Sequence, residues 1–184
     1  MEKTNTRLTK SDWLDCALHV LALEGVNGVR VERLARKLGV TKGSFYWHFR
    51  DREDLLDRLI EYWMQTLTIA VREETKEASG GPEQRLFALM REIRERHAAD
   101  FDVAVRAWGA HDPKVARIVE RVDAIRLDYV RSLFREMGFR GRQAEIRARF
   151  CYFYEAADPM ILAHQDAEEE KRQLKLRHKF LTMR

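Results

Sequence analysis

Near its N-terminus the chain reads Leu34-Ala35-Arg36-Lys37-Leu38-Gly39-Val40-Thr41-Lys42-Gly43-Ser44-Phe45. Two short helices that cross at a steep angle need a small residue at the close approach, a residue that tolerates positive φ at the turn, and an apolar residue that locks the crossing. Ala35, Gly39 and Phe45 meet these needs in that order. The spacing therefore predicts a helix-turn-helix, built from a helix over 31–38 and a second helix over 42–49.

Helical patterns flank this motif on both sides. Ahead of it, apolar residues at the helical period predict a helix over 11–24. Gly25 and Gly28 are expected to end that helix because both can take positive φ. After the motif, Asp51 is expected to cap a long helix over 51–78.

The rest of the chain carries helical patterns as well. They cover 83–97, 101–110, 113–137, 142–163 and 167–182. Pro159 is expected to kink or end the helix in which it lies, and no stretch alternates between polar and apolar residues as a strand would. The sequence therefore predicts an all-α fold, with an N-terminal three-helix helix-turn-helix domain over residues 1–50 and a larger C-terminal helical domain over 51–184.

The composition fits a folded helical protein. The 184 residues are 45% hydrophobic and 35% charged, with only 9 Gly and 3 Pro, which excludes disordered and collagen-like chains. The two cysteines, Cys16 and Cys151, form no C-x-x-C pattern, so neither a disulfide framework nor a thiolate metal site is expected. No apolar run approaches the ~20 residues that cross a bilayer. We expect a cytoplasmic protein that needs no membrane, metal or other cofactor.

Positive charge is concentrated around the helix-turn-helix. Between residues 28 and 52 the acidic residues are Glu32 and Asp51, and the basic residues are Arg30, Arg33, Arg36, Lys37, Lys42, Arg50 and Arg52. The whole chain carries a net charge of only +4, so the remainder is close to neutral. Such local concentration suits the neutralisation of phosphates and the release of counterions. The motif is therefore predicted to bind duplex DNA, with its second helix in the major groove.

Residues 39–49, followed by Arg52, Glu53, Leu55 and Leu56, resemble the DNA-binding domain of the TetR family of transcriptional regulators. The resemblance extends over about residues 8–60 and implies contacts with double-stranded operator DNA. The residues that it assigns to DNA are Arg33, Thr41, Lys42, Gly43, Ser44, Tyr46, Trp47, His48 and Arg52. The sequence departs from the family at Val31, where a hydroxylated capping residue is frequent.

The resemblance also implies roles for particular side chains. The Thr41 hydroxyl is expected to cap the second helix or to reach a phosphate or a base, and Lys42 to supply charge at the groove. Tyr46 is expected to contact phosphate, and Arg52 to hold a phosphate through two parallel hydrogen bonds. Trp47 leaves two interpretations open, since it can meet the DNA backbone or pack on the first helix.

For the larger domain the resemblance implies a small-molecule effector and a homodimer. The effector cavity is expected to be lined by Trp63, Phe87, Met90, Phe101, Trp108, Tyr129 and Tyr152. The dimer interface is expected to include Phe150, Phe153, Tyr154, Ala157, Ile161, Leu174, His178 and Leu181. These positions also suit an intrachain core, so the pattern alone leaves open which faces are buried within one chain. Dimerisation itself is expected because one helix-turn-helix reads only one half-site.

The predicted function is a ligand-responsive, sequence-specific transcriptional regulator, a repressor that a small-molecule effector releases from a palindromic operator. The alternative is an all-α small-molecule-binding protein or enzyme without specific DNA binding, which predicts no sequence preference and no steep loss of DNA affinity with salt. No G-x-S-x-G, P-loop, G-x-G-x-x-G or H-E-x-x-H motif supports catalysis, so we do not expect an enzyme.

Overall fold

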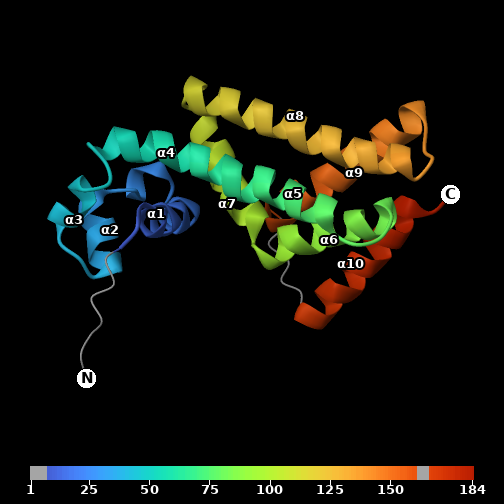
Figure 1. The fold of residues 1–184 in the computed structure, drawn as a ribbon, viewed down its shortest axis with the longest axis horizontal. Coiled ribbons are helices and arrows are strands. Elements are labelled where there is room, and N and C mark those ends of the chain that lie inside the picture. Colours follow the sequence, from blue (N-terminus) through green and yellow to red (C-terminus); the bar gives the residue numbers. More distant parts are fainter. Residues whose placement is uncertain (1–7, 161–165) are drawn as a thin grey trace. The chain divides into compact units, whose positions relative to one another are not determined.

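The computed structural model describes residues 8–160 and 166–184 of the chain. Within these residues every regular element is a helix (Figure 1), which confirms the all-α prediction. The chain divides into two compact units, and the division falls between Trp63 and Met64. No helix in the described ranges is long and apolar enough to cross a membrane.

The first unit holds the helix-turn-helix. Its elements are α1 (Lys10–Glu24), the 3-10 turn η1 (Val26–Gly28), α2 (Val31–Leu38), α3 (Lys42–Tyr46) and α4 (Arg52–Met64). A reciprocal capping box of Thr9 and Asp12 starts α1. The amide of Asp54 donates to Asp51 Oδ1 at 2.8 Å, so Asp51 caps α4 as predicted.

Three aromatic rings form the centre of the first unit. Phe45 of α3 meets Trp13 of α1 edge to face, with ring centroids 5.4 Å apart, and stacks on Phe49 at 5.1 Å. All three rings are buried, and so is Ala35. Gly39, at the end of α2, takes the left-handed conformation with φ 69°. The predicted turn and the predicted lock of the helix pair are therefore confirmed.

The two glycines after α1 have different tasks. Gly25 takes φ 69° and ends α1 as predicted. Gly28 does not take positive φ, but a Cβ at this position would lie 2.6 Å from the Cβ of Glu24. The prediction for Gly28 was wrong, because this glycine is required by the close approach of α1 and not by the turn itself.

The second unit packs its helices around one apolar core. Its elements are the π-helical η2 (Gln65–Ile69), α5 (Ala70–Glu77), α6 (Pro82–Glu95), α7 (Ala98–Gly109), α8 (Pro113–Glu136), α9 (Gly141–Ala157), the 3-10 turn η3 (Asp158–Met160) and α10 (Ala167–Thr182). The long helix α8 lies beside both α7 and α9 (Figure 1). Leu86, Met90, Leu133, Phe134 and Ala148 are among the buried residues of the core.

Two observed helices differ from those predicted. The helix predicted over 51–78 is interrupted by the wider turn of η2, which follows Met64. The α-helix predicted over 142–163 ends at Ala157 and gives way to a 3-10 turn that contains Pro159, in agreement with the effect expected of proline. Residues 161–163 of that prediction lie outside the described residues.

Candidate functional site

The outer surface of α3 presents the side chains that were predicted to contact DNA. Thr41, Lys42, Gly43, Tyr46 and Trp47 are exposed, and Ser44 and His48 are half-buried. The exposed fractions of Tyr46 and Trp47 are 61% and 76%. For Trp47 this exposure favours contact with a partner over packing on α1. Phe45 of α3 and Phe49 after it are buried in the core, so the opposite face of α3 points outward.

α3 is shorter than predicted. It ends at Tyr46, and the amides of His48 and Phe49 both donate to the carbonyl of Phe45, at 2.9 and 3.0 Å. This turn brings Phe49 back into the core and ends the helix. The Thr41 side chain makes no capping hydrogen bond, so only the second role predicted for its hydroxyl, a contact with DNA, is left.

Acidic neighbours hold two of the cations that were predicted to contact DNA. The Lys42 ammonium lies 2.7 Å from Glu32 Oε1, and the Arg33 guanidinium pairs with Glu24. The hydrogen bond from Lys42 lowers the pKa of the Glu32 carboxyl. Lys42 and Glu32 are more than half exposed, and exposed ion pairs contribute little free energy. A phosphate can therefore take the place of either carboxylate.

Arg52 points into the first unit. Its Nε donates to the carbonyl of Val29 at 2.7 Å, and its Nη2 donates to the carbonyl of Val26 at 2.8 Å. The guanidinium thereby joins the start of α4 to η1. These two carbonyls engage Nε and Nη2, which form one of the guanidinium edges that could hold a phosphate through two parallel hydrogen bonds. We therefore regard Arg52 as a residue that positions elements of the first unit.

An exposed short helix that an aromatic core holds outward, on a surface rich in arginine and lysine, defines a helix-turn-helix DNA-binding protein. Comparison with known proteins gives the family. Residues 14–59 match the family described as bacterial regulatory proteins, tetR family. The first unit of the chain thus carries the DNA-binding domain of the TetR family of bacterial regulatory proteins.

Curated relatives match the same region. The chain is 36% identical over 59 residues to the HTH-type transcriptional regulator AcrR of Shigella flexneri, a match that covers 32% of this chain and 27% of the relative. It is 41% identical over 56 residues to the class A tetracycline repressor protein from transposon 1721 of Escherichia coli, with 30% and 26% covered. These matches thus span about a quarter of the length of the curated relatives.

Solved structures share the fold over nearly the whole chain. The fatty acid degradation regulator FadR from Bacillus halodurans has a TM-score of 0.68 to this chain at 19% identity. The match covers 99% of this chain and 97% of that protein. At this identity the likeness concerns the fold alone.

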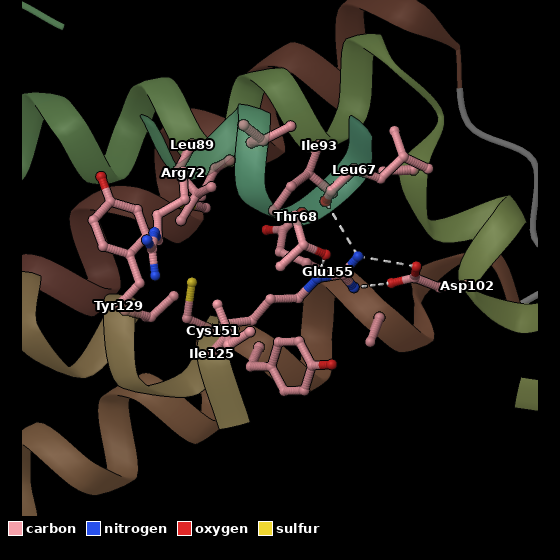
Figure 2. A pocket seen from close by; sticks show the side chains of 17 residues that line it. Leu67, Thr68, Arg72, Leu89, Ile93, Asp102, Ile125, Tyr129, Cys151 and Glu155 are labelled. Carbon is pink, nitrogen blue, oxygen red and sulfur yellow. Dashed lines mark hydrogen bonds and ion pairs between the residues drawn. The ribbon is translucent and has the colours of Figure 1, made fainter. Parts of the chain in front are cut away.

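The second unit contains a pocket with mostly apolar walls (Figure 2). It is lined by Leu67, Thr68, Val71, Arg72, Leu89, Met90, Ile93, Ala98, Asp102, Ile125, Arg126, Tyr129, Val130, Cys151, Tyr152, Glu155 and Ala156. In Figure 2, Asp102 and Tyr129 lie at opposite sides of the pocket. Met90, Tyr129 and Tyr152, which were predicted to surround an effector cavity, are among the lining residues.

The other residues predicted for the cavity do not line this pocket. Trp63 is buried and belongs to the first unit. Phe101 is buried and Trp108 is half-buried on α7. Phe87 packs against the core and meets His178 edge to face, with centroids 5.2 Å apart. Aromatic residues at helical spacing serve a core as readily as a cavity, which is why the sequence did not separate them.

Sequence reasoning missed four charged side chains of the pocket, those of Arg72, Asp102, Arg126 and Glu155. Each continues a line of buried residues at helical spacing. Arg126, for example, stands four residues after the buried Val122 and four before the buried Val130. A charge within a buried stripe is the signal that could have identified them, because charged residues are seldom buried unless they are paired.

Asp102 and Arg126 form a buried ion pair at the wall of the pocket. The guanidinium donates to both carboxylate oxygens, to the Thr68 hydroxyl at 3.0 Å and to the carbonyl of Leu67 at 3.2 Å. Burial by itself would lower the pKa of Arg126, but the charge and hydrogen bonds of Asp102 outweigh it and raise the pKa. The guanidinium therefore stays charged.

Tyr152 joins a second pair close to the pocket. Its hydroxyl donates to Asp123 Oδ1 at 2.5 Å and accepts from Arg106 Nη2 at 2.7 Å. Arg106 also pairs with Asp123 at 2.6 Å. Burial alone would raise the pKa of Asp123, but hydrogen bonds from Arg106 and Tyr152 outweigh it and lower the pKa. These polar groups are satisfied within the chain.

Glu155 is the remaining acidic side chain of the pocket. Its Oε1 accepts from Arg177 Nη2 at 3.0 Å, and its side chain is 10% exposed. Burial raises the pKa of Glu155 to about 7, although Arg177 opposes the shift. A carboxyl that exchanges its proton near neutral pH, in a largely apolar cavity, is a typical feature of functional sites.

The residues predicted for a dimer interface divide between surface and core. On α9, Phe150 and Phe153 are exposed, Tyr154 is partly exposed and Ala157 is half-buried. Ile161 lies outside the described residues. The Arg177 guanidinium lies 3.9 Å from the centroid of the Tyr154 ring, whereas Phe150 and Phe153 face solvent in the single chain. A role of these residues in a dimer stays a prediction.

The predicted stripe of α10 faces inward. Leu174 and Leu181 belong to the core, and His178 Nε2 lies 2.8 Å from the carbonyl of Glu83. The exposed apolar side chains at this end of the chain are those of Leu176, Phe180 and Met183. Both sets recur at spacings of three and four residues, so periodicity could not decide which one the core buries.

Proposed function

We propose that this chain is a ligand-responsive, sequence-specific transcriptional regulator, a homodimeric repressor that a small-molecule effector releases from a palindromic operator in the bacterial cytoplasm. The observation that carries the proposal is the exposed face of α3, where Lys42, Tyr46 and Trp47 surround the buried Phe45. The family and relatives such as the tetracycline repressor support this function.

In this proposal α3 and the turn after it enter the major groove. Thr41, Lys42, Gly43, Ser44, Tyr46, Trp47 and His48 meet bases or phosphates there. Lys42 and Arg33 exchange their carboxylate partners for phosphate groups of the DNA. Ion pairs at the surface contribute little free energy, and the closely spaced phosphates of a duplex attract a lysine or arginine more strongly than a single carboxylate does. Arg52 acts indirectly, by fixing the start of α4 against η1.

The proposed homodimer uses the apolar surface of α9 and α10. Phe150 and Phe153 of α9 and Phe180 of α10 are each more than half exposed. Exposed aromatic side chains of this size are unfavourable in water, and a second copy would remove them from it. The dimer also supplies the second helix-turn-helix that a palindrome requires, at a spacing of about 34–36 Å.

The pocket of the second unit is the proposed effector site. Apolar walls with a few converging polar groups are typical of small-molecule sites. For release of DNA, the effector must bind the DNA-free form more tightly than the DNA-bound form.

Footprinting of the purified protein on the DNA that flanks its own gene tests this function. We expect a protected site with two-fold symmetry, binding that weakens steeply as salt rises, and lower reporter transcription when the protein is present. An all-α ligand-binding protein or enzyme would protect no site and would not distinguish the operator from a scrambled duplex. Higher reporter transcription would make the protein an activator.

A further inference from the structure

Each charged side chain on the wall of the pocket forms an ion pair with an oppositely charged side chain of the same protein. The pairs are Asp102 with Arg126, Glu155 with Arg177, and Arg72 with Glu73. Once Glu155 is ionised, above its pKa of about 7, a charged ligand would therefore enter a largely apolar cavity whose own charges already cancel. It would lose its hydration without gaining a counter-ion, which is strongly unfavourable.

The uncharged polar side chains of the pocket are also engaged. The Tyr129 hydroxyl lies 3.0 Å from Thr75 Oγ1, and the Tyr152 hydroxyl both donates and accepts within the chain. Thr68 accepts from Arg126. Burial raises the pKa of the Cys151 thiol, so it stays neutral. These groups leave little hydrogen-bonding capacity for a ligand.

Glu155 differs from them because Arg177 engages only one of its oxygens. Among the described residues, the hydrogen bond that the Glu155 side chain makes is the one that Oε1 accepts from Arg177. The charged groups around it are Arg177 of α10, Arg94 of α6 and Asp158 of η3. Oε2 can serve a ligand as an acceptor when the carboxyl is ionised, and the same carboxyl can donate when it is protonated.

We infer that this pocket takes an uncharged lipophilic ligand whose one polar group, a hydroxyl or an amide N–H, hydrogen bonds to Glu155. The inference rests on the proposed function, which gives the pocket its role as an effector site. It goes further by fixing the charge of the ligand and the side chain that binds its polar group. While Glu155 is ionised, carboxylates and ammonium ions on the same apolar body are rejected.

Calorimetric titration with three probes that share one apolar body tests the inference. The probes are phenylbutanol, phenylbutanoate and phenylbutylamine. The titrations are done at about pH 8.5, where Glu155 is ionised and the last two probes are both charged. We expect phenylbutanol to bind the full-length protein at least about tenfold more tightly than either ion, since each ion brings an uncompensated charge. Equal binding of either ion, or no binding of phenylbutanol, would overturn the inference.

The Glu155→Gln variant provides a second measurement. It keeps the shape and hydrogen-bonding capacity of the side chain but leaves the Arg177 guanidinium without its anion. Phenylbutanoate should then bind about tenfold more tightly than to the unmodified protein, while phenylbutanol changes by less than about threefold. Glu168→Gln is the matched control, because Glu168 pairs with Lys171 at the exposed surface and the net charge changes equally.

Unchanged phenylbutanoate binding in Glu155→Gln, or the same gain in Glu168→Gln, would contradict the role of Glu155. Calorimetry without DNA measures the ligand class alone. A mobility shift with operator DNA and no probe measures the proposed function alone. The failure of one can therefore be told from the failure of the other.

Discussion

Lys42, the first residue of α3, has its ammonium 2.7 Å from Glu32 Oε1. In the second unit, Glu155 accepts a hydrogen bond from Arg177 with one of its oxygens. The two pairs differ in burial, because the Lys42 side chain is 58% exposed and that of Glu155 10% exposed. An exposed pair exchanges partners at little cost in free energy. A buried carboxyl instead responds to its surroundings by a change of protonation.

Lys42→Ala should weaken operator binding about three- to tenfold and reduce the slope of log affinity against log salt by about two, because each of the two copies in the proposed dimer loses one phosphate contact. Folding and dimerisation should not change, since the side chain is exposed. Mobility shifts over a salt series measure both quantities. Lys37→Ala is the matched control, as Lys37 is an exposed lysine on α2 outside the predicted contacts. Equal affinities for Lys42→Ala and the unmodified protein would remove Lys42 from the interface.

Glu155 should make the free energy of unfolding fall as pH rises from about 4.5 to about 7. The pKa of this carboxyl is raised from 4.5 to about 7 in the folded state, so the folded protein binds more protons than the unfolded chain within that window. The contribution of this carboxyl is on the order of 3 kcal/mol across the window and is constant above it. Urea denaturation at a series of pH values measures the slope.

Two variants isolate the effect of Glu155. Glu155→Gln should abolish the slope between about pH 4.5 and 7. Glu145→Gln should leave that slope intact, because hydrogen bonds from Arg131 and Arg149 lower the pKa of Glu145 to about 2. The stability that Glu145 contributes is present above pH 4.5 and is lost only as pH falls toward 2. Identical curves for Glu155→Gln and the unmodified protein would show that this carboxyl has an ordinary pKa.

At the scale of elements, the first unit depends on contacts between segments that are distant in sequence. Phe45 brings α3 against Trp13 of α1, and Arg52 brings the start of α4 against η1. The close approach at Gly28 packs η1 on α1. The orientation of α3 therefore depends on elements that do not themselves meet DNA in the proposed function.

Arg52→Gln should lower the free energy of unfolding by about 2 kcal/mol, because two carbonyls of the η1 region lose their donor. Urea denaturation measures this change, and Arg50→Gln is the control, since its side chain is 83% exposed. The salt dependence of operator binding should be unchanged in Arg52→Gln. A slope reduced by about two, one contact for each copy in the proposed dimer, with unaltered stability, would instead support the phosphate contact that the sequence predicted.

At the scale of the whole molecule, the proposed function requires two copies of the chain. α9 and α10 both carry large apolar side chains that the second unit does not bury, among them Phe150 and Phe180. Leu174 and Leu181, on the other face of α10, are already in the core. The same helix thus buries one face in its own chain and leaves the other exposed, which is the face that the proposed dimer would cover.

The double variant Phe150→Glu with Phe180→Glu should be monomeric and should bind the operator more than about tenfold more weakly, since each monomer reads one half-site. Sedimentation equilibrium measures the mass, and circular dichroism checks that the helices persist. Leu23→Glu is the control, as Leu23 is an apolar residue of α1 that is 77% exposed. A double variant that remains a dimer would locate the interface elsewhere.

Local chemistry made much of this molecule predictable. Gly39 and Ala35 are residue types that a tight crossing of two helices demands, and Asp51 is a residue type that helix starts prefer, so each could be recognised from its neighbours alone. The helical period gave the order of the elements because it depends on residues three and four apart. The role of Phe45 could be predicted from its spacing to Ala35 and Gly39, whereas its contact with Trp13 joins helices that are distant in sequence.

The contacts that sequence reasoning missed join residues far apart in the chain. Arg52 meets the carbonyl of Val26, and Arg126 meets Asp102, through packing that no local pattern encodes. The core buries the face of α10 that carries Leu174 and leaves the face that carries Phe180 exposed, although apolar residues recur at the helical period on both faces. The sequence by itself thus determines the helices and the turn, because these depend on residues a few positions apart. Which side chains are buried and which charges pair depends on which helix faces meet, and only the packing of all the helices decides that.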